Sequence, residues 1–305
     1  MSTAFIFPGQ GAQAVGMGSD AWHDSPAARA VFDEADSVLG VPLSRLILEG
    51  PADELVRSHN AQPAILCVSV AMLRAAEERL GAAMPSPAFT AGHSVGEYAA
   101  LVAAGSLSLS EGLRLVRTRG QLMQAACEAT PSGMAALIGL TLEPARQACE
   151  GTGAQVANVN SAEQIVLGGP NDALERAIEN AKNAGARRAI PLEVAGAFHT
   201  EVMRPAQEAM ADVLAEAALN TATVPVVANT TAQPVGSADE VRAELASQLC
   251  GCVYWQQSVE LMAARGVDRF IEFGPGKVLT GLAKRIAPDA TALAIADLDA
   301  ISTLA

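Results

Sequence analysis

The chain has 305 residues, half of them hydrophobic and 17% charged, and its 20 Lys plus Arg against 33 Asp plus Glu give a formal net charge of −13. This acidic balance argues against nucleic-acid binding, which needs a basic surface, and the high apolar content excludes a disordered chain. At this length we expect one large domain with an insertion, or two domains.

Four short apolar runs are each followed by a glycine-bearing turn and helical periodicity, at 4–7, 89–92, 224–228 and 269–273. This pattern is typical of parallel strands that feed helices in an α/β fold. Between the second and third runs the rhythm changes to a strand, a helix, two strands, a helix and a strand, at 134–140, 143–150, 155–158, 164–167, 172–184 and 186–194. The order βαββαβ is ferredoxin-like, and it predicts a small subdomain inserted at about 128–196.

The predicted first strand leads into PGQGAQ, where Gly9, Gly11 and Ala14 satisfy the relaxed dinucleotide pattern G-x-G-x-x-A. A nucleotide-binding oxidoreductase is therefore a rival interpretation. That fingerprint also requires a second strand ending in an acidic residue about twenty residues further on, whereas Asp33 and Glu34 fall in a helical pattern. The glycines are better explained by close approach of the backbone to a reacting centre.

The stretch FTAGHSVGEYAAL at 89–101 places G-x-S-x-G between a predicted strand and an Ala-rich helix. It has the form of a nucleophile elbow, in which Gly92 and Gly96 remove side chains that would collide around Ser94. The N-terminus of the helix directs N–H groups at an oxyanion formed there. We predict that Ser94 is a nucleophile, and the alternative is a serine that only caps the helix.

Arg119 lies in a helix predicted over 110–126, where its i−4, i−3, i+3 and i+4 neighbours are Leu115, Val116, Leu122 and Met123. This spacing places a guanidinium within an apolar stripe. A buried cation without a partner costs about several kcal/mol, so we expect Arg119 to have one. The partner is either an internal carboxylate or the carboxylate of a ligand.

A serine nucleophile needs a base, and the chain contains four histidines. His93 adjoins Ser94, and neighbouring side chains on a strand point to opposite faces, so it is poorly placed to accept the serine proton. His23 and His59 lie in polar surroundings and are expected at the surface. His199 follows a predicted strand and precedes a predicted helix, whose macrodipole would keep its imidazole neutral and available as a base. A capping or core histidine is the alternative at that position.

The longest uncharged stretch, residues 217–238, cannot span a bilayer because Pro225, Pro234 and several threonines interrupt it. The first 19 residues lack a basic n-region, so we expect no signal peptide and a cytoplasmic location. The five cysteines are irregularly spaced and no histidine is near enough in sequence to complete a zinc motif. They are expected to be core thiols, and a metal site assembled from distant residues has no support in the sequence.

Six motifs occur in order along essentially the whole chain: FPGQGAQ (7–13), GHSVGEYAAL (92–101), TRG (118–120), ANVNSAEQIVLGG (157–169), AGAFHT (195–200) and EFGPGKVLTGL (272–282). Together they resemble the malonyl-CoA:acyl carrier protein transacylases of fatty acid and polyketide synthesis. The resemblance implies an α/β-hydrolase-like core with a parallel sheet, formed by 1–127 and 197–305. It also implies a ferredoxin-like subdomain at 128–196, in agreement with the pattern of predicted elements.

The resemblance implies that Ser94 is the acyl-accepting nucleophile and that His199 is its base. It implies an oxyanion hole made by the backbone N–H groups of Gln10 and Val95. In such enzymes a backbone carbonyl orients the histidine instead of an acidic side chain, and Gln248 occupies that position here.

The substrate-binding residues implied by the resemblance begin with Arg119, which would grip the malonyl carboxylate. His93, Met123 and Asn160 are further substrate-binding positions. Phe198 precedes the histidine and would crowd a methyl branch at the substrate α-carbon, which favours malonyl over methylmalonyl.

The implied reaction is a ping-pong transfer from malonyl-CoA through an acyl-serine to the phosphopantetheine thiol of an acyl carrier protein. We expect no metal or redox cofactor, no nucleic-acid or membrane partner, and a monomer. One alternative is an acyl-thioester hydrolase or esterase, because the same Ser/His site serves when water is the acceptor. Another is a catalytically inactive subunit that docks the carrier, although the presence of both Ser94 and His199 argues against it.

Overall fold

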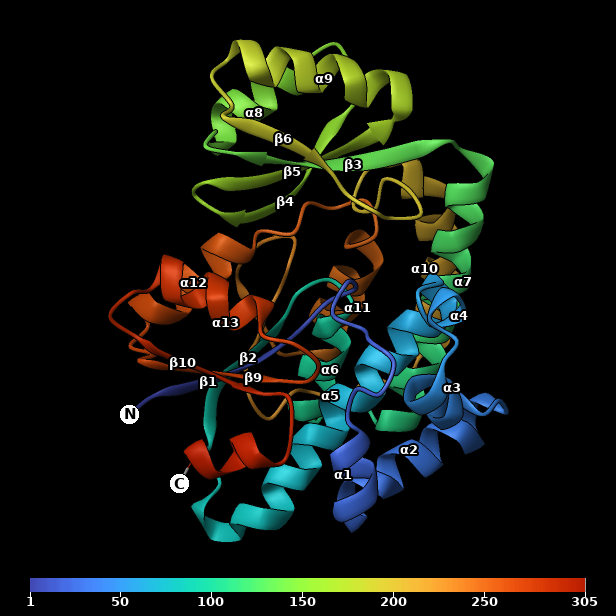
Figure 1. Ribbon diagram of the computed structural model, residues 1–305, viewed down its shortest axis with the longest axis vertical. Coiled ribbons are helices and arrows are strands. Elements are labelled where there is room, and N and C mark those ends of the chain that lie inside the picture. Colours follow the sequence, from blue (N-terminus) through green and yellow to red (C-terminus); the bar gives the residue numbers. More distant parts are fainter. Residues whose placement is uncertain (305) are drawn as a thin grey trace.

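The computed structural model describes residues 1–304, which form two β-sheets and the helices that cover them (Figure 1). The larger sheet has six strands in the order β10-β9-β1-β2-β7-β8, and every pairing is parallel except that of β7 with β8. Its strands are β1 (Thr3–Phe7), β2 (Pro87–Gly92), β7 (Val226–Val227), β8 (Pro234–Val235), β9 (Arg269–Phe273) and β10 (Thr291–Ile295).

The four apolar runs predicted as parallel strands are confirmed as β1, β2, β7 and β9, although β7 retains only two residues of its predicted run. The edge strands β8 and β10 are not predicted from the local sequence pattern. The sequence of β10 is TALAI, and its alanines suit a helix as well as a strand, so the local pattern does not discriminate. Pairing with β9 decides the conformation of this segment.

Alternate residues of β1 contribute to two different hydrophobic cores, because successive side chains of a strand point to opposite faces. Ala4 and Ile6 pack with α12 (Trp255–Ala264) and α13 (Val278–Ile286). Phe5 and Phe7 pack on the other face with α2 (Pro26–Leu39), α5 (Ser58–Leu80), α6 (Gly96–Ala103), α7 (Leu109–Ala129) and α10 (Arg204–Glu216). Helices therefore cover both faces of the sheet, as a parallel sheet requires.

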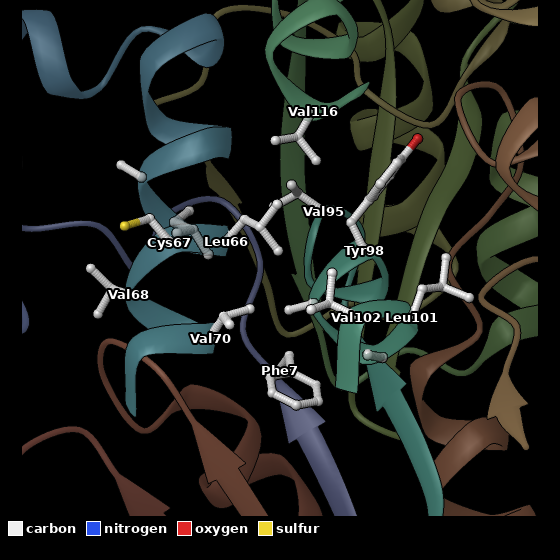
Figure 2. Close-up of a cluster of buried hydrophobic side chains, with 14 of the residues drawn as sticks. Phe7, Leu66, Cys67, Val68, Val70, Val95, Tyr98, Leu101, Val102 and Val116 are labelled. Atoms are coloured by element: carbon white, nitrogen blue, oxygen red, sulfur yellow. The ribbon is translucent and has the colours of Figure 1, made fainter. Parts of the chain in front are cut away.

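Side chains of the core on the α5 face pack against the start of α6 (Figure 2). Leu66 and Val70 of α5 point toward Val95 and Val102, and Phe7 at the end of β1 lies beside them. All five side chains are buried. Val95 directly follows Ser94, so packing of its side chain fixes the backbone of the turn that carries the serine.

The smaller sheet is antiparallel, with the strand order β4-β5-β3-β6. Its strands are β3 (Ser132–Ile138), β4 (Gln155–Ser161), β5 (Gln164–Pro170) and β6 (Arg188–Pro191), and α8 (Leu142–Cys149) and α9 (Asn171–Asn183) pack on one face. This is the predicted βαββαβ arrangement with ferredoxin-like strand order. Met134, Ala136 and Val166, on the opposite face, join the main core and attach this sheet to the larger unit.

The other helical segments are short: α1 (Ser19–Asp24), α3 (Leu43–Glu49), α4 (Ala52–Leu55), α11 (Ala238–Ser247) and the 3-10 turns η1 (Gly81–Ala83), η2 (Glu201–Met203) and η3 (Asp299–Leu304). Asp33 and Glu34 lie within α2, as predicted, so the dinucleotide fingerprint lacks its second strand. Across residues 1–304, no helix combines the length and the apolar character needed to cross a membrane.

Candidate active site

Ser94 lies in the tight turn between β2, which ends at Gly92, and α6, which begins at Gly96. Its φ of 53° is in the left-handed region, which non-glycine residues rarely adopt. A Cβ at Gly92 would lie 2.0 Å from the carbonyl carbon of Gly96, and one at Gly96 would lie 2.2 Å from the carbonyl oxygen of Phe7. Neither position can carry a side chain, so the turn has the predicted geometry of a nucleophile elbow.

The Ser94 hydroxyl contacts His199, although the two residues are 105 positions apart in sequence. Ser94 Oγ lies 2.7 Å from His199 Nε2, and His199 Nδ1 lies 2.8 Å from the main-chain oxygen of Gln248. A carbonyl oxygen only accepts, so Nδ1 carries the proton and donates it. Nε2 is then the free acceptor for the serine proton. The structure thus places Gln248 where the resemblance implied a histidine-orienting carbonyl.

Burial and the nearby Arg119 cation lower the pKa of His199 from its usual 6.5 to about 3, so the imidazole is neutral at physiological pH. The sequence predicts this neutral imidazole from a helix macrodipole, whereas burial has the largest effect on its pKa in the structure. His199 is followed by the short turn η2, capped by Thr200, and α10 begins only at Arg204. The dipole of a helix falls off within its first turn, so desolvation is the main cause.

Arg119 is 1% exposed, in line with its predicted place in an apolar stripe, and its guanidinium reaches the Ser94 hydroxyl. Nη2 donates to Ser94 Oγ at 3.2 Å and to Gln248 Oε1 at 2.8 Å, while Nη1 donates to Gln62 Oε1 at 2.8 Å. Within residues 1–304 no carboxylate forms an ion pair with Arg119, and its buried Nε–H has no protein acceptor. Of the two partners expected, an internal carboxylate is therefore not found.

The loop after β1 approaches the elbow closely. A Cβ at Gly9 would lie 2.6 Å from the carbonyl oxygen of His93, so only glycine allows this approach, as the interpretation of the N-terminal glycines required. Gly9 therefore packs against the turn that also contains Val95, and Gln10 is the next residue along the chain. In the part of the chain that the structure describes, neither backbone amide donates to a protein acceptor. Both remain available as the oxyanion donors that the resemblance implies.

The other predicted substrate-binding residues lie around this centre. Within residues 1–304, none of them forms a hydrogen bond with the Ser94 hydroxyl. His93 Nε2 lies 2.9 Å from Asn160 Oδ1, which joins the elbow to β4, and burial lowers the pKa of His93. Met123 is buried, and its sulfur accepts from the Gln62 amide that also holds Arg119. Phe198 is buried in the main core.

Two histidines were expected at the surface. His23 is exposed, as predicted. His59 is partly buried, and burial lowers its pKa, so that prediction is wrong in part. Neither is among the residues that contact Ser94 within residues 1–304.

Three residues of the site are absent from the sequence-based predictions. Gln62 holds Arg119, Asn229 Oδ1 accepts the Ser94 backbone N–H at 2.7 Å, and the Glu97 carboxylate accepts from Asn229 and from Gln248. Asn229 follows β7, whose carboxyl end lies at the same sheet edge as Ser94. That position could have identified it, since ligand sites of parallel sheets gather there.

The five cysteines are all unpaired, and Cys67, Cys127 and Cys149 are buried, as expected of core thiols. Cys250 and Cys252 are only partly buried. No group of three or more His, Cys, Asp or Glu residues within 1–304 is arranged to hold a metal ion.

Comparison with known proteins gives a consistent result. Residues 4–295 match the model of a family described as the acyl transferase domain. The chain is 44% identical to a malonyl CoA-acyl carrier protein transacylase of Bacillus subtilis (strain 168), over 98% of this chain and 94% of that protein. It superimposes on an acyl carrier protein S-malonyltransferase from Vibrio cholerae with a TM-score of 0.96, at 40% identity over the full length of both chains. A malonyl-transacylase solved in complex with its type II PKS acyl-carrier protein matches with a TM-score of 0.94, at 39% identity, over 100% of this chain and 99% of that one.

Proposed function

The chain belongs to the acyl transferase family that contains the malonyl CoA-acyl carrier protein transacylases, and on this basis we propose that it transfers a malonyl group from malonyl-CoA to the phosphopantetheine thiol of an acyl carrier protein. One observation carries the proposal. The Ser94 hydroxyl is hydrogen-bonded both to the neutral base His199 and to the cation Arg119. A nucleophile, its base and a binding group for a carboxylate therefore meet at one oxygen atom.

In the first half-reaction, Ser94 Oγ attacks the thioester carbonyl of malonyl-CoA while His199 Nε2 accepts the hydroxyl proton. The Gln10 and Val95 amides donate to the tetrahedral oxyanion. Collapse of this intermediate breaks the C–S bond, and the proton held by His199 passes to the departing CoA sulfur. The products of this step are CoA thiol and malonyl-Ser94.

In the second half-reaction, the phosphopantetheine thiol takes the place of CoA. His199 accepts the thiol proton, the sulfur attacks the ester carbonyl of malonyl-Ser94, and the same two amides hold the oxyanion. Collapse returns the proton to Ser94 Oγ and releases the malonyl carrier. The exchange is redox-neutral and the chain supplies base and oxyanion donors, so we propose that no cofactor takes part.

The test of this function compares acceptors. Incubation with malonyl-CoA and a phosphopantetheinylated carrier should yield malonyl carrier, measured by intact mass, in large excess over free malonate. The hydrolase alternative predicts free malonate as the main product whether or not carrier is present. Equal malonate release in both incubations would contradict the proposed transfer.

The pH dependence of acylation should reflect the lowered pKa of His199. Protonation removes the base, so the acidic loss of activity belongs near the lowered pKa of about 3 and not near 6.5. We expect the rate constant for acylation of Ser94 to stay level from about pH 8 to about pH 5. Rapid-quench measurement of the adduct, with thermal stability followed at each pH, checks this. A decline centred near 6.5 in folded protein would show that the imidazole is not desolvated.

Despite the net charge of −13, we propose that the carrier docks on local basic side chains, since association depends on local potential. Arg187 and Arg188 are candidates, but Arg187 already pairs with Glu163. Arg188 is the first residue of β6, and the chain leads toward His199 from the opposite end of that strand. Lys277 is better placed, because it follows β9 at the sheet edge that carries Ser94, and Lys284, Arg285 and Lys277 are all exposed.

Charge reversal of Lys277, Lys284 and Arg285 together should raise the KM for carrier about tenfold or more, while the rate of loading from malonyl-CoA stays unchanged. Lys182→Glu provides the matched control, because Lys182 is exposed on α9, on the outer face of the smaller sheet. Steady-state kinetics with varied carrier measures the effect. An unchanged KM for carrier would mean that the carrier docks elsewhere.

A further inference from the structure

We propose that Glu97 is a positioning residue, whose single carboxylate fixes the relative positions of the nucleophile, the base and Arg119. The inference rests on the proposed function, because it concerns the rate at which Ser94 becomes acylated. Glu97 lies in the first turn of α6 and is 1% exposed. Both of its oxygen atoms accept hydrogen bonds from groups that in turn contact the reacting residues.

The first connection runs to the elbow. Glu97 Oε1 accepts the backbone N–H of Asn229 at 3.2 Å. The Asn229 side chain then bridges the turn, because its Oδ1 accepts the N–H of Ser94 at 2.7 Å and its Nδ2 donates to the Gly92 carbonyl at 2.7 Å. Ser94 has a positive φ, which a side chain disfavours, so contacts on both sides of the turn are needed to maintain it.

The second connection runs to the base and to Arg119. Glu97 Oε2 accepts from the side-chain amide nitrogen of Gln248, which also donates to the main-chain oxygen of Ser94 at 3.2 Å. Gln248 Oε1 accepts from Arg119 Nη2, and the main-chain oxygen of Gln248 accepts from His199 Nδ1. Gln248 thus connects Glu97 with the other two functional side chains.

The acceptor character of Glu97 determines which way the Gln248 amide faces. Burial and the neighbouring Glu244 raise the pKa of Glu97, while the hydrogen bonds from Gln248 and Asn229 oppose that shift. Both Glu97 oxygens accept hydrogen bonds, so the Gln248 amide nitrogen faces Glu97 and the amide oxygen faces Arg119. With the opposite orientation, the amide N–H₂ would face the guanidinium, which has only donors. Glu97 therefore acts together with the Ser94 main-chain oxygen to favour the one orientation in which Gln248 and Arg119 can form a hydrogen bond.

Glu97→Gln preserves the size of the side chain but replaces one acceptor oxygen with a donor. Asn229 and Gln248 both donate to this side chain, so one of the two connections must be lost. We expect the rate constant for acylation of Ser94 at saturating malonyl-CoA to fall about ten- to a hundredfold. The final amount of adduct should remain one malonyl group per chain. A purely structural defect would lower that amount and the melting temperature, without slowing the molecules that stay folded.

Glu244→Gln is the matched control. Glu244 is a second buried carboxylate beside the first, but its oxygen atoms accept from the backbone N–H and the hydroxyl of Thr230, and within residues 1–304 its side chain forms no hydrogen bond with Gln248 or with Ser94. Rapid-quench experiments read out by intact mass compare the two variants with the wild type. We expect Glu244→Gln to acylate at the wild-type rate.

An E97Q variant that acylates at the wild-type rate would overturn the inference, and so would an equal slowing in E244Q. If E97Q does not fold, Asn229→Ala serves as the second test, because it removes only the connection to the elbow. It should also slow acylation, and a wild-type rate there would overturn the inference as well. Failure of the wild-type protein to form any malonyl adduct would instead contradict the proposed function, so the two failures are distinguishable.

Discussion

Ser94→Ala should abolish the acyl-enzyme. The substitution removes the only oxygen to which the base His199 and the cation Arg119 are both hydrogen-bonded within residues 1–304. Loss of the nucleophile in serine enzymes with a Ser/His site lowers kcat by about a millionfold, so turnover should fall below detection. The measurement is the intact mass of the variant after incubation with malonyl-CoA, in which no shift of malonyl size should be seen.

The variant isolates the role of the Ser94 hydroxyl, because alanine can adopt the backbone conformation of this turn about as readily as serine. Alanine carries the same Cβ as serine in the left-handed turn, where φ is 53°, and the contacts of the Ser94 N–H and carbonyl groups do not involve the hydroxyl. An unaltered melting temperature would show that the elbow is intact. A stoichiometric malonyl adduct on folded Ser94→Ala would refute the assignment of the nucleophile.

Arg119→Ala should change the preference between substrates. A bidentate contact between a guanidinium and a carboxylate in a desolvated pocket contributes about 1.5 to 3 kcal/mol, or about ten- to a hundredfold in rate or affinity. The variant should lose at least this factor for malonyl-CoA, whose carboxylate would be buried without its partner. Acetyl-CoA has no carboxylate, so its use should be unchanged or should improve.

The ratio of kcat/KM for the two thioesters is the decisive measurement, because Arg119 also contacts Ser94 Oγ and lowers the pKa of His199. Effects through those contacts reach both substrates alike and cancel in the ratio. Arg119→Lys should recover part of the malonyl activity, since an ammonium cannot present two parallel donors. Arg117→Ala is the control on the same helix, because its guanidinium donates to the His59 carbonyl and to Asn60. An equal fall for both thioesters would mean that Arg119 acts through Ser94 and His199 or supports the fold, and does not bind the malonyl carboxylate.

The features that the sequence predicts well depend on local periodicity and on local steric conflict. Gly92 and Gly96 flank Ser94 within five residues, so a strand followed by a helix is enough to predict the elbow. The burial of Arg119 follows in the same way, because a 3.6-residue period places it among apolar neighbours whatever the helix packs against. The ferredoxin-like subdomain was predictable because its alternating helices and strands are consecutive along the chain.

The partners of these residues depend on the tertiary structure. Ser94 meets His199 across 105 residues, and Arg119 meets Gln62 and Gln248 across 57 and 129. A periodic pattern shows that a guanidinium will be buried, but it does not show whether a carboxylate or two amide oxygens will satisfy it. The order of strands in the parallel sheet and the packing of α5, α6 and α7 bring these groups together.

The protonation state of His199 and the partners of Glu97 also depend on the tertiary structure. The sequence led to a neutral His199 through a helix dipole, whereas burial and the Arg119 cation lower its pKa in the folded protein. The role of Glu97 was also undetectable in the sequence, since a glutamate in the first turn of a helix ordinarily faces solvent and favours the helix dipole. The donors to its two oxygen atoms come from Asn229 and Gln248, which are more than a hundred residues away in sequence and lie beside Glu97 only in the folded protein. Local sequence therefore determines which side chains are held at a turn or buried in a stripe, while desolvation and hydrogen-bond partners depend on contacts that exist only once the chain has folded.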